Sequence, residues 1–161
     1  TAICRMGRKS IINFVSKVVK LMQINIAETE QEIKNCYAVM SQLRPHLSFE
    51  DFVGQVKRQM KDSNFRLVYL EENATVKAVA GIRIAEWLAT GKNLEIEDLV
   101  ASDKERSKGF GGKLFDWIVD YGKSENCNRI KLVSNVKRFA AHRFYLNKRM
   151  NIEAHYFSLQ L

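Results

Sequence analysis

Residues 94 to 114 run Leu94-Glu-Ile-Glu-Asp-Leu-Val-Ala-Ser-Asp-Lys-Glu-Arg-Ser-Lys-Gly-Phe-Gly-Gly-Lys-Leu114, a pattern that predicts a strand, a polar turn and the glycine-rich start of a helix. The first N–H groups of a helix lack intrahelical partners and lie at the positive end of the helix dipole, so they can bind an anion. The glycines at 109, 111 and 112 carry no Cβ that would hold a phosphate away, and Arg106 and Lys108 add positive charge. The stretch therefore predicts a diphosphate site.

The glycine pattern taken alone has a second interpretation. Glycines that open a helix often serve only a tight turn or close packing. A Rossmann or P-loop motif fits less well, because the chain has neither a full Gly-x-Gly-x-x-Gly at its first strand nor a loop that ends in Gly-Lys-Ser/Thr. The flanking sequence must decide between a diphosphate site and simple packing.

Hydrophobic periodicity and turn residues predict the elements around this stretch. We expect strands at residues 23–28, 65–71, 75–88, 94–101, 129–134 and 152–159. We expect helices at residues 29–43, 48–60, 108–123 and 138–148, the first two opened by the capping residues Thr29 and Ser48. The order β-α-α-β-β-β-α-β-α-β predicts an α/β fold with a mixed sheet and helices on both faces.

Length and composition limit the class of protein. A chain of 161 residues, 46% apolar and 27% charged, predicts one globular domain, which we place at residues 22–161. Residues 1–21 hold five of the 26 basic residues and none of the 18 acidic ones; they form a basic leader whose place in the native fold is left open. The remainder is nearly balanced in charge, so nucleic acid binding is not expected.

Two further classes are also disfavoured by the sequence. No stretch approaches the roughly 18 consecutive apolar residues of a membrane-spanning helix. The three cysteines, at positions 4, 36 and 127, have neither disulfide nor zinc spacing, which favours a cytoplasmic protein. A monomer and a homodimer are both compatible with the sequence.

Two motifs resemble those of the GNAT N-acetyltransferases. Arg106-Ser-Lys-Gly-Phe-Gly111, after the strand Ile96-Glu-Asp-Leu-Val100, resembles their acetyl-CoA motif. Ser134-Asn-Val-Lys-Arg-Phe-Ala-Ala-His-Arg-Phe-Tyr145 resembles their later motif, in which a strand ends near an Asn and the next helix carries Ala-x-x-Phe-Tyr. The motifs occur in the family's order, and the resemblance covers residues 23–161. Within the family, the second motif is most similar to that of aminoalkylphosphonate acetyltransferases, and the strand is also similar to that of spermidine acetyltransferases.

The resemblance implies the GNAT fold, with a mostly antiparallel sheet splayed at the coenzyme site, and acetyl-CoA as the co-substrate. It implies that the coenzyme is bound by Leu99, Val100, Arg106, Ser107, Lys108, Gly109, Phe110, Gly111, Gly112 and Asn135. The backbone of the first two would pair with the pantetheine arm as an added strand does, and one of their N–H groups would stabilise the oxyanion. Asn135, at the end of a strand, could equally be an ordinary turn residue.

The resemblance also implies two catalytic residues, Tyr145 and Glu97. Tyr145 would protonate the departing thiolate; the alternative is a core tyrosine that only packs. Glu97 would take the amine proton through water; the alternative is that Glu97 and Asp98 are both solvated acids. Because side chains alternate along a strand, we expect only one of these two carboxylates to face the acceptor. His142 and His155 lack a carboxylate at ligand spacing, so no metal site is predicted.

One feature departs from the family pattern. After the tyrosine most members have Gly-Phe or Gly-Tyr at the end of the helix, whereas this chain has Arg149-Met150. A left-handed arginine would cost roughly 1 kcal/mol, so we expect the helix to end by a different turn.

We therefore expect an N-acetyltransferase that moves an acetyl group from acetyl-CoA to an amine, preferably of a small molecule, by direct attack on the thioester. Two other functions remain compatible with the sequence. One is an inactive acyl-CoA sensor or partner-binding module, and the other is a nucleic-acid or membrane-surface binder that uses the basic leader.

Overall fold

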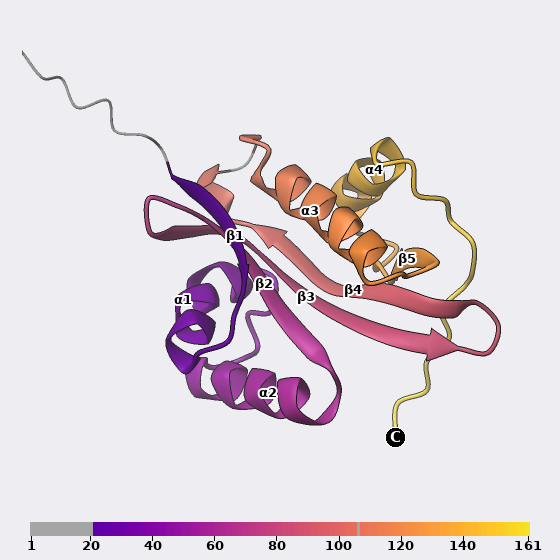
Figure 1. Ribbon diagram of the computed structural model, residues 1–161, viewed down its shortest axis with the longest axis horizontal. Helices are drawn as coiled ribbons and strands as arrows, with labels where there is room; N and C mark the ends of the chain where they lie inside the picture. Colours follow the sequence, from indigo (N-terminus) through magenta and orange to yellow (C-terminus); the bar gives the residue numbers. More distant parts are fainter. Residues whose placement is uncertain (1–20, 106) are drawn as a thin grey trace, which may run out of the picture.

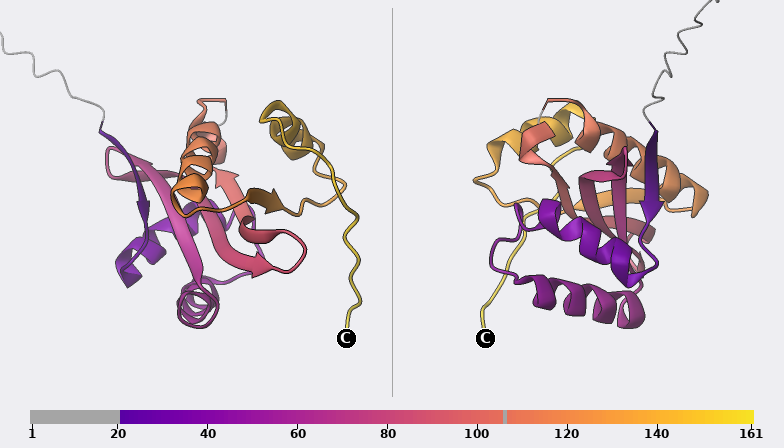
Figure 2. Two further views of the ribbon diagram at one scale, coloured as in Figure 1. Left: turned by 45° about the vertical axis from the view of Figure 1, so that its right-hand side comes forward. Right: turned by 90° about the vertical axis from the view of Figure 1, so that its left-hand side faces the viewer.

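The computed structural model describes residues 21–105 and 107–161 and shows one mixed sheet with helices on both faces (Figure 1). Within these residues the sheet has five strands in the order β1-β2-β3-β4-β5: β1 (Met22–Ile26), β2 (Phe65–Glu72), β3 (Thr75–Trp87), β4 (Gly91–Ala101) and β5 (Arg129–Leu132). Helices α1 (Glu30–Met40) and α2 (Phe49–Asp62) cover one face, and α3 (Phe110–Ser124) and α4 (Phe139–Asn147) lie on the other (Figure 2). The α/β prediction is confirmed.

The sheet changes direction at β5. The first four strands are antiparallel neighbours, whereas β4 and β5 are parallel because α3 carries the chain back across the sheet. This pairing joins Asn93–Ile96 to Arg129–Leu132 and then stops, while β4 continues to Ala101. The last five residues of β4 therefore have no partner in β5.

Apolar side chains form a core on each face of the sheet. One core, between the sheet and α1 and α2, is built mainly from Ile33, Cys36, Val39, Met40, Phe52, Val56, Phe65, Leu67 and Val79. The other, between the sheet and α3, is built mainly from Val68, Leu70, Ala80, Ile82, Leu94, Ile96, Leu114, Phe115 and Ile118. Burial on both faces explains why the middle parts of β2 and β3 are nearly continuous apolar runs.

The caps of the first two helices form as predicted. The Thr29 hydroxyl accepts a hydrogen bond from the Glu32 N–H, and the Glu32 carboxylate accepts one from the Thr29 N–H at 2.8 Å, which completes a capping box. The Ser48 hydroxyl accepts from the Asp51 N–H at 3.1 Å. These local contacts set where α1 and α2 begin.

The predicted last strand is wrong. Residues 151–161 form no strand and are all exposed, although their polar and apolar side chains alternate. An alternating segment becomes a strand only when a neighbouring strand accepts its hydrogen bonds. In the described part of the chain β5, only four residues long, pairs with β4 alone, and the segment is tied near it by the Arg129–Glu153 ion pair at 2.8 Å.

Two other predictions concern the basic leader and membrane-spanning helices. The basic leader falls, except for Leu21, outside the described residues. Among the helices that are described, none has both the length and the hydropathy of a membrane-crossing segment.

Candidate functional site

The N-terminus of α3 presents backbone rather than side chains. Its N-cap, Gly109, has a φ of 80° and offers no side-chain cap, and the first turn holds no acidic residue. The first hydrogen bond of the helix is donated by the Lys113 N–H to the Gly109 carbonyl, at 2.9 Å. The N–H groups of residues 110 to 112 precede it at the positive end of the helix dipole, so this turn can bind an anion.

The three glycines of this turn have different roles. Only Gly109 needs a left-handed backbone, and a Cβ there would meet nothing within 4 Å. A Cβ on Gly111 would lie 3.7 Å from that of Ala101, and one on Gly112 would lie 3.7 Å from the Lys148 ammonium. Gly111 and Gly112 therefore face protein atoms. Of the three glycines, only Gly109 has open space where a Cβ would lie, so a ligand could approach the backbone there.

The other residues of the predicted diphosphate turn differ in how exposed their side chains are. Ser107 and Lys108 are exposed, and Ser107 has a φ of 68°. The Phe110 side chain is buried in the α3 core, so only its backbone can contact a ligand. Arg106 lies outside the described residues.

A β-bulge reshapes the middle of β4. Gly81 of β3 lies opposite Asp98, and the next residue, Ile82, lies opposite Ile96, so Glu97 is an extra residue in the ladder. The bulge reverses the alternation, and Ile96 and Leu99 consequently pack in the same core, on the α3 side. The prediction that Glu97 and Asp98 face opposite ways is therefore wrong.

Both carboxylates line one cavity on the other face of the sheet. This carboxylate cavity, of about 250 Å³, is lined by Met40, Arg44, His46, Leu47, Phe52, Gln55, Val56, Gln59, Phe65, Leu67, Glu97 and Asp98. Buried side chains of α1, α2 and β2 supply its apolar wall. The turn between α1 and α2, one side of α2 and the bulge of β4 supply its polar groups.

Each carboxylate is held by an arginine. The Arg83 Nε lies 2.5 Å from Glu97 Oε1, and the Arg44 Nε and Nη2 both lie 2.7 Å from Asp98 Oδ1. The Asp98 side chain is only 18% exposed, so its pair is less screened by water than a surface pair. Charge inside the cavity is consequently close to balanced.

Tyr145 lies on α4, on the opposite side of β4. Its ring packs against that of Phe144 with centroids 5.4 Å apart, and Phe144 packs edge-on against Phe115 at 5.7 Å. Burial raises the pKa of the Tyr145 phenol, the Arg138 guanidinium opposes that rise, and the Asp98 carboxylate adds to it. The cavity that Asp98 lines and the Tyr145 phenol thus lie on the two sides of β4.

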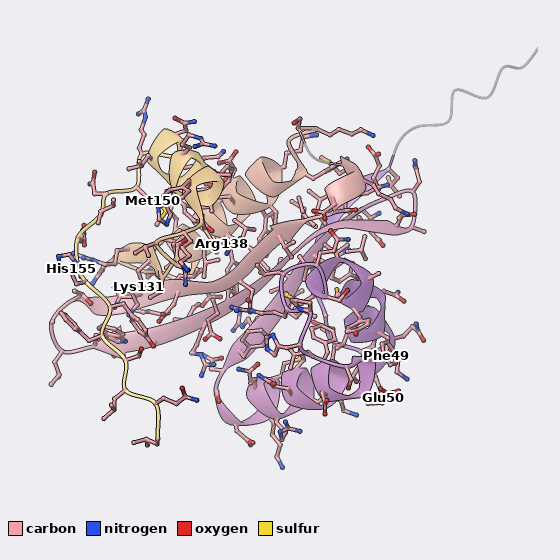
Figure 3. The ribbon with its side chains drawn as sticks, turned by 180° about the vertical axis from the view of Figure 1, so that it is seen from behind. Phe49, Glu50, Lys131, Arg138, Met150 and His155 are labelled. Atoms are coloured by element: carbon pink, nitrogen blue, oxygen red, sulfur yellow. The ribbon has the colours of Figure 1, made fainter. Side chains whose placement is uncertain are left out.

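The turn after α4 corrects a second prediction. Arg149 has a φ of 63°, its N–H donates to the Leu146 carbonyl at 2.9 Å, and the Met150 N–H donates to the Tyr145 carbonyl at 3.1 Å. These two bonds form a Schellman motif, with Arg149 in the left-handed position usually taken by glycine. The apolar contact of Met150 with the α3 core favours this turn in spite of the strained arginine. Figure 3 labels Arg138 and Met150, which flank α4.

The remaining candidates have structural partners of their own. The Asn135 side-chain oxygen accepts from the Lys137 N–H at 2.9 Å and its carbonyl accepts from the Arg138 N–H at 2.9 Å, so this residue closes a turn. In the part of the chain that the structure describes, no three His, Cys, Asp or Glu side chains lie together as a metal site.

Sequence reasoning missed three residues of the site, Arg44, His46 and Arg83. None belongs to a motif, and the two arginines lie 54 and 14 residues from the carboxylates that they contact. The only sequence signal close to Arg44 and His46 was the Arg44–Pro45 pair, which predicts the end of a helix. It indicates a turn and says nothing about what the turn faces.

Known proteins match this chain in sequence and in fold. The model of the Acetyltransferase (GNAT) family matches residues 26–150. Uncharacterized N-acetyltransferase YhdJ of Bacillus subtilis (strain 168) is 31% identical over 120 residues, which cover 74% of this chain and 84% of that protein. Aminoalkylphosphonate N-acetyltransferase of Salmonella typhimurium (strain LT2) is 24% identical over 138 residues, which cover 81% and 86%.

A solved structure shares the fold. The aminoglycoside N-acetyltransferase AAC(6')-Iy, in complex with CoA, superposes with a TM-score of 0.78 at 9% identity, over 88% of this chain and 95% of its own. The family match, for its part, runs from the end of β1 to Met150 and so includes the carboxylate cavity, the start of α3 and Tyr145.

Proposed function

The chain belongs to the acetyltransferase (GNAT) family and is an acetyl-CoA-dependent acyltransferase, and we propose that it acetylates the amine of a small zwitterion bound in the carboxylate cavity. The observation that carries the proposal is that Glu97 and Asp98, each beside an arginine, line one small cavity at the β4 bulge. Tyr145 lies on the other side of the same strand.

The described residues fit acetyl-CoA. The uncapped first turn of α3 offers N–H groups to a diphosphate, and no acidic side chain in that turn repels it. Beyond Ile96 the β5 side of β4 is no longer paired, so the backbone of Leu99 and Val100 can pair with the pantetheine arm as an added strand does. Lys108 and Asn135, both exposed, lie on loops next to α3 and α4 and would contact the coenzyme there.

The reaction needs a base, an oxyanion donor and an acid. We assign the base to Glu97, which takes the proton of the amine as its nitrogen bonds to the thioester carbon. A backbone N–H of β4 near Leu99 stabilises the oxyanion. Tyr145, which like any phenol is protonated at neutral pH, gives its proton to the sulfur as the carbon–sulfur bond breaks; burial raises the pKa of this phenol and makes it a weaker acid than an exposed tyrosine.

The cavity favours a small acceptor with charges of both signs. A volume of about 250 Å³ lies below the range of roughly 300–1,000 Å³ that is typical of sites for drug-sized ligands. Glu97 and Asp98 provide carboxylate oxygens for an ammonium group, while Arg44, although paired with Asp98, and the His46 ring provide hydrogen-bond donors for an acidic group. A polyamine lacks the acidic group, and a cavity of this volume holds only the end of a peptide. The relative named aminoalkylphosphonate N-acetyltransferase, whose named substrate carries an amine and an acidic group, supports the same class.

A thiol-release assay on a panel of amines tests the proposal. The panel contains aminoalkylphosphonates, amino acids, polyamines and a peptide with a free N-terminus, and free coenzyme A is the readout. We expect turnover with acceptors that carry an acidic group, and Arg44→Gln should raise their KM more than that of an uncharged amine.

Variants of the two assigned residues complete the test. Tyr145→Phe and Glu97→Gln should each lower kcat by about 100-fold or more while the Kd of acetyl-CoA stays nearly constant. Asp98→Asn serves as the comparison for the base. Binding of acetyl-CoA without thiol release on any amine would instead indicate a sensor, and turnover confined to polyamines would contradict the acceptor class.

A further inference from the structure

Helix α4 carries Tyr145 but is held to the rest of the protein by few contacts. None of its nine residues, Phe139–Asn147, is fully buried. Its aromatic contact is the edge-on packing of Phe144 against Phe115 of α3. A helix attached in this way needs a further contact if its tyrosine is to keep a defined place beside the reacting atoms.

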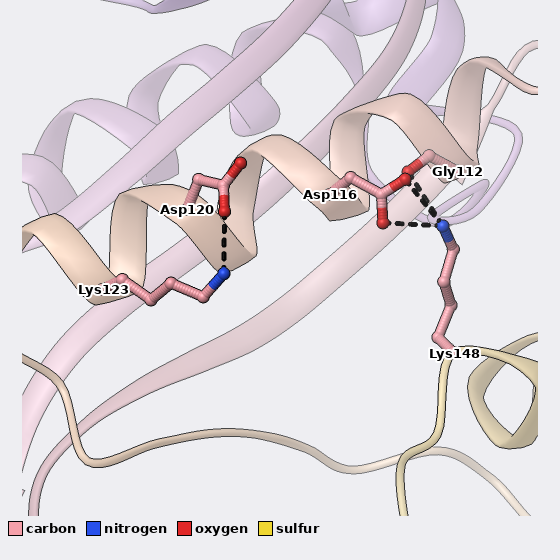
Figure 4. A network of polar contacts seen from close by, with 5 residues as sticks. All are labelled: Gly112, Asp116, Asp120, Lys123 and Lys148. Carbon is pink, nitrogen blue, oxygen red and sulfur yellow. Dashed lines mark hydrogen bonds and ion pairs between the residues drawn. The ribbon is translucent and has the colours of Figure 1, made fainter.

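Lys148, the residue that ends α4, makes such a contact. Its ammonium group lies 2.7 and 2.8 Å from the two carboxylate oxygens of Asp116 and 3.5 Å from the Gly112 carbonyl, both on α3 (Figure 4). The same group lies 5.7 Å from the ring centre of Phe115 and 6.0 Å from that of Phe144. The lysine side chain is 26% exposed, so the aromatic rings reduce its contact with water.

The two ends of this contact belong to the two halves of the active site. Gly112 and Asp116 lie in the first two turns of α3, and the Gly112 N–H is one of the groups that would face the diphosphate. Lys148 lies three residues after Tyr145, in the Schellman turn whose hydrogen bond uses the Tyr145 carbonyl. Movement of Lys148 relative to α3 would therefore move the phenol relative to the coenzyme.

We propose that Lys148 is a positioning residue, which fixes α4 against the first turns of α3 and thereby holds the Tyr145 phenol at the sulfur of a coenzyme bound there. This inference rests on the role proposed for Tyr145. The partners of Lys148 in this structure are the Asp116 carboxylate and a helix carbonyl, so its proposed action is through α4 and not through contact with a substrate.

The chain contains a matched control pair. Lys123 and Asp120 lie 3.0 Å apart, are 72% and 76% exposed, and both belong to α3 (Figure 4). Removal of this pair takes away the same kind of charge contact without loosening α4. Lys123→Met should therefore leave kcat unchanged.

The experiment compares Lys148→Met, Asp116→Asn, the double variant and Lys123→Met in the thiol-release assay. Methionine keeps much of the lysine stem over the two rings and removes the charge. We expect Lys148→Met and Asp116→Asn each to lower kcat by about tenfold, with the Kd of acetyl-CoA within about twofold, because small misplacements of a catalytic group cost rate. The double variant should be no slower than either single variant, since both remove one interaction. The charge exchange Lys148→Glu with Asp116→Lys should recover part of the lost rate.

Three results would overturn the proposal. If the loss of kcat in the double variant equalled the product of the losses in the two single variants, the residues would act separately. A raised Kd for acetyl-CoA with an unchanged kcat would show that Lys148 is a coenzyme ligand. A lower melting temperature with an unchanged kcat would make the pair purely structural. A native Tyr145→Phe rate would refute the proposed acid itself, and that measurement does not depend on Lys148.

Discussion

The left-handed arginine after α4 provides a sharp test of the structure. Arg149 has a φ of 63° and an exposed side chain. A left-handed backbone costs an L residue about 1–2 kcal/mol, and glycine is free of most of that cost. The greater freedom of glycine in the unfolded chain removes about 0.4–1 kcal/mol of the gain. Arg149→Gly should therefore stabilise the protein by about 0.5–1 kcal/mol, or about 1–3 °C in melting temperature for a domain of this size.

Two further variants separate backbone strain from loss of the side chain. Arg149→Ala removes the guanidinium but keeps the strain, so its stability should stay within about 0.5 kcal/mol of the native protein. Arg143→Gly places glycine at an exposed position inside α4 and should destabilise by about 1 kcal/mol. Urea unfolding and thermal scans on the three variants measure these differences. If Arg149→Gly proved as destabilising as Arg143→Gly, the Schellman turn with a strained arginine would be refuted.

Three further predictions follow from single residues. The pKa of Glu32 is lowered to about 2 by hydrogen bonds from the Thr29 hydroxyl, then from the Thr29 and Glu28 N–H groups, so its stabilising effect is present above pH 4.5 and is lost as the pH falls toward 2. Glu32→Gln should reduce this acid dependence in urea midpoints measured from pH 6 to 2, and an unchanged slope would contradict the capping box. Burial raises the pKa of the Cys36 thiol to about 12; with the other two cysteines replaced by serine, Ellman's reagent at pH 8 should react only after unfolding, and rapid labelling of native protein would show that α1 is loosely packed. The stability that this thiol contributes is present below pH 9 and is lost as the pH rises toward 12. Gly109→Ala should cost about 1 kcal/mol through its φ of 80° and weaken acetyl-CoA binding several-fold by calorimetry, whereas Gly111→Ala should bind nearly as tightly as native protein.

Much of the fold could be predicted because its signals are local. The Thr29 and Ser48 caps act on N–H groups three residues away, and they set the starts of α1 and α2 where the sequence indicated. The glycine-rich start of α3 is also local, since a positive φ at residue 109 and unpaired first-turn N–H groups need no distant partner. These features are properties of short segments, which a sequence pattern describes well.

The site depended on contacts that no short segment contains. The carboxylates of Glu97 and Asp98 share a cavity because β3 and β4 change register at Gly81, a result of pairing between two strands. The prediction of a strand at residues 152–159 was wrong for a related reason. Alternation of polar and apolar residues describes the segment itself but does not show whether a neighbouring strand is there to pair with it.

By itself, the sequence determined the order of the elements through the last helix, the caps and the glycine-rich start of α3, because these depend on residues within a few positions of one another. Tertiary structure alone decided the bulge at Glu97, the arginines beside the two carboxylates and the strained turn at Arg149. In each of these cases the free energy of contacts between distant segments outweighs the local preference of the backbone.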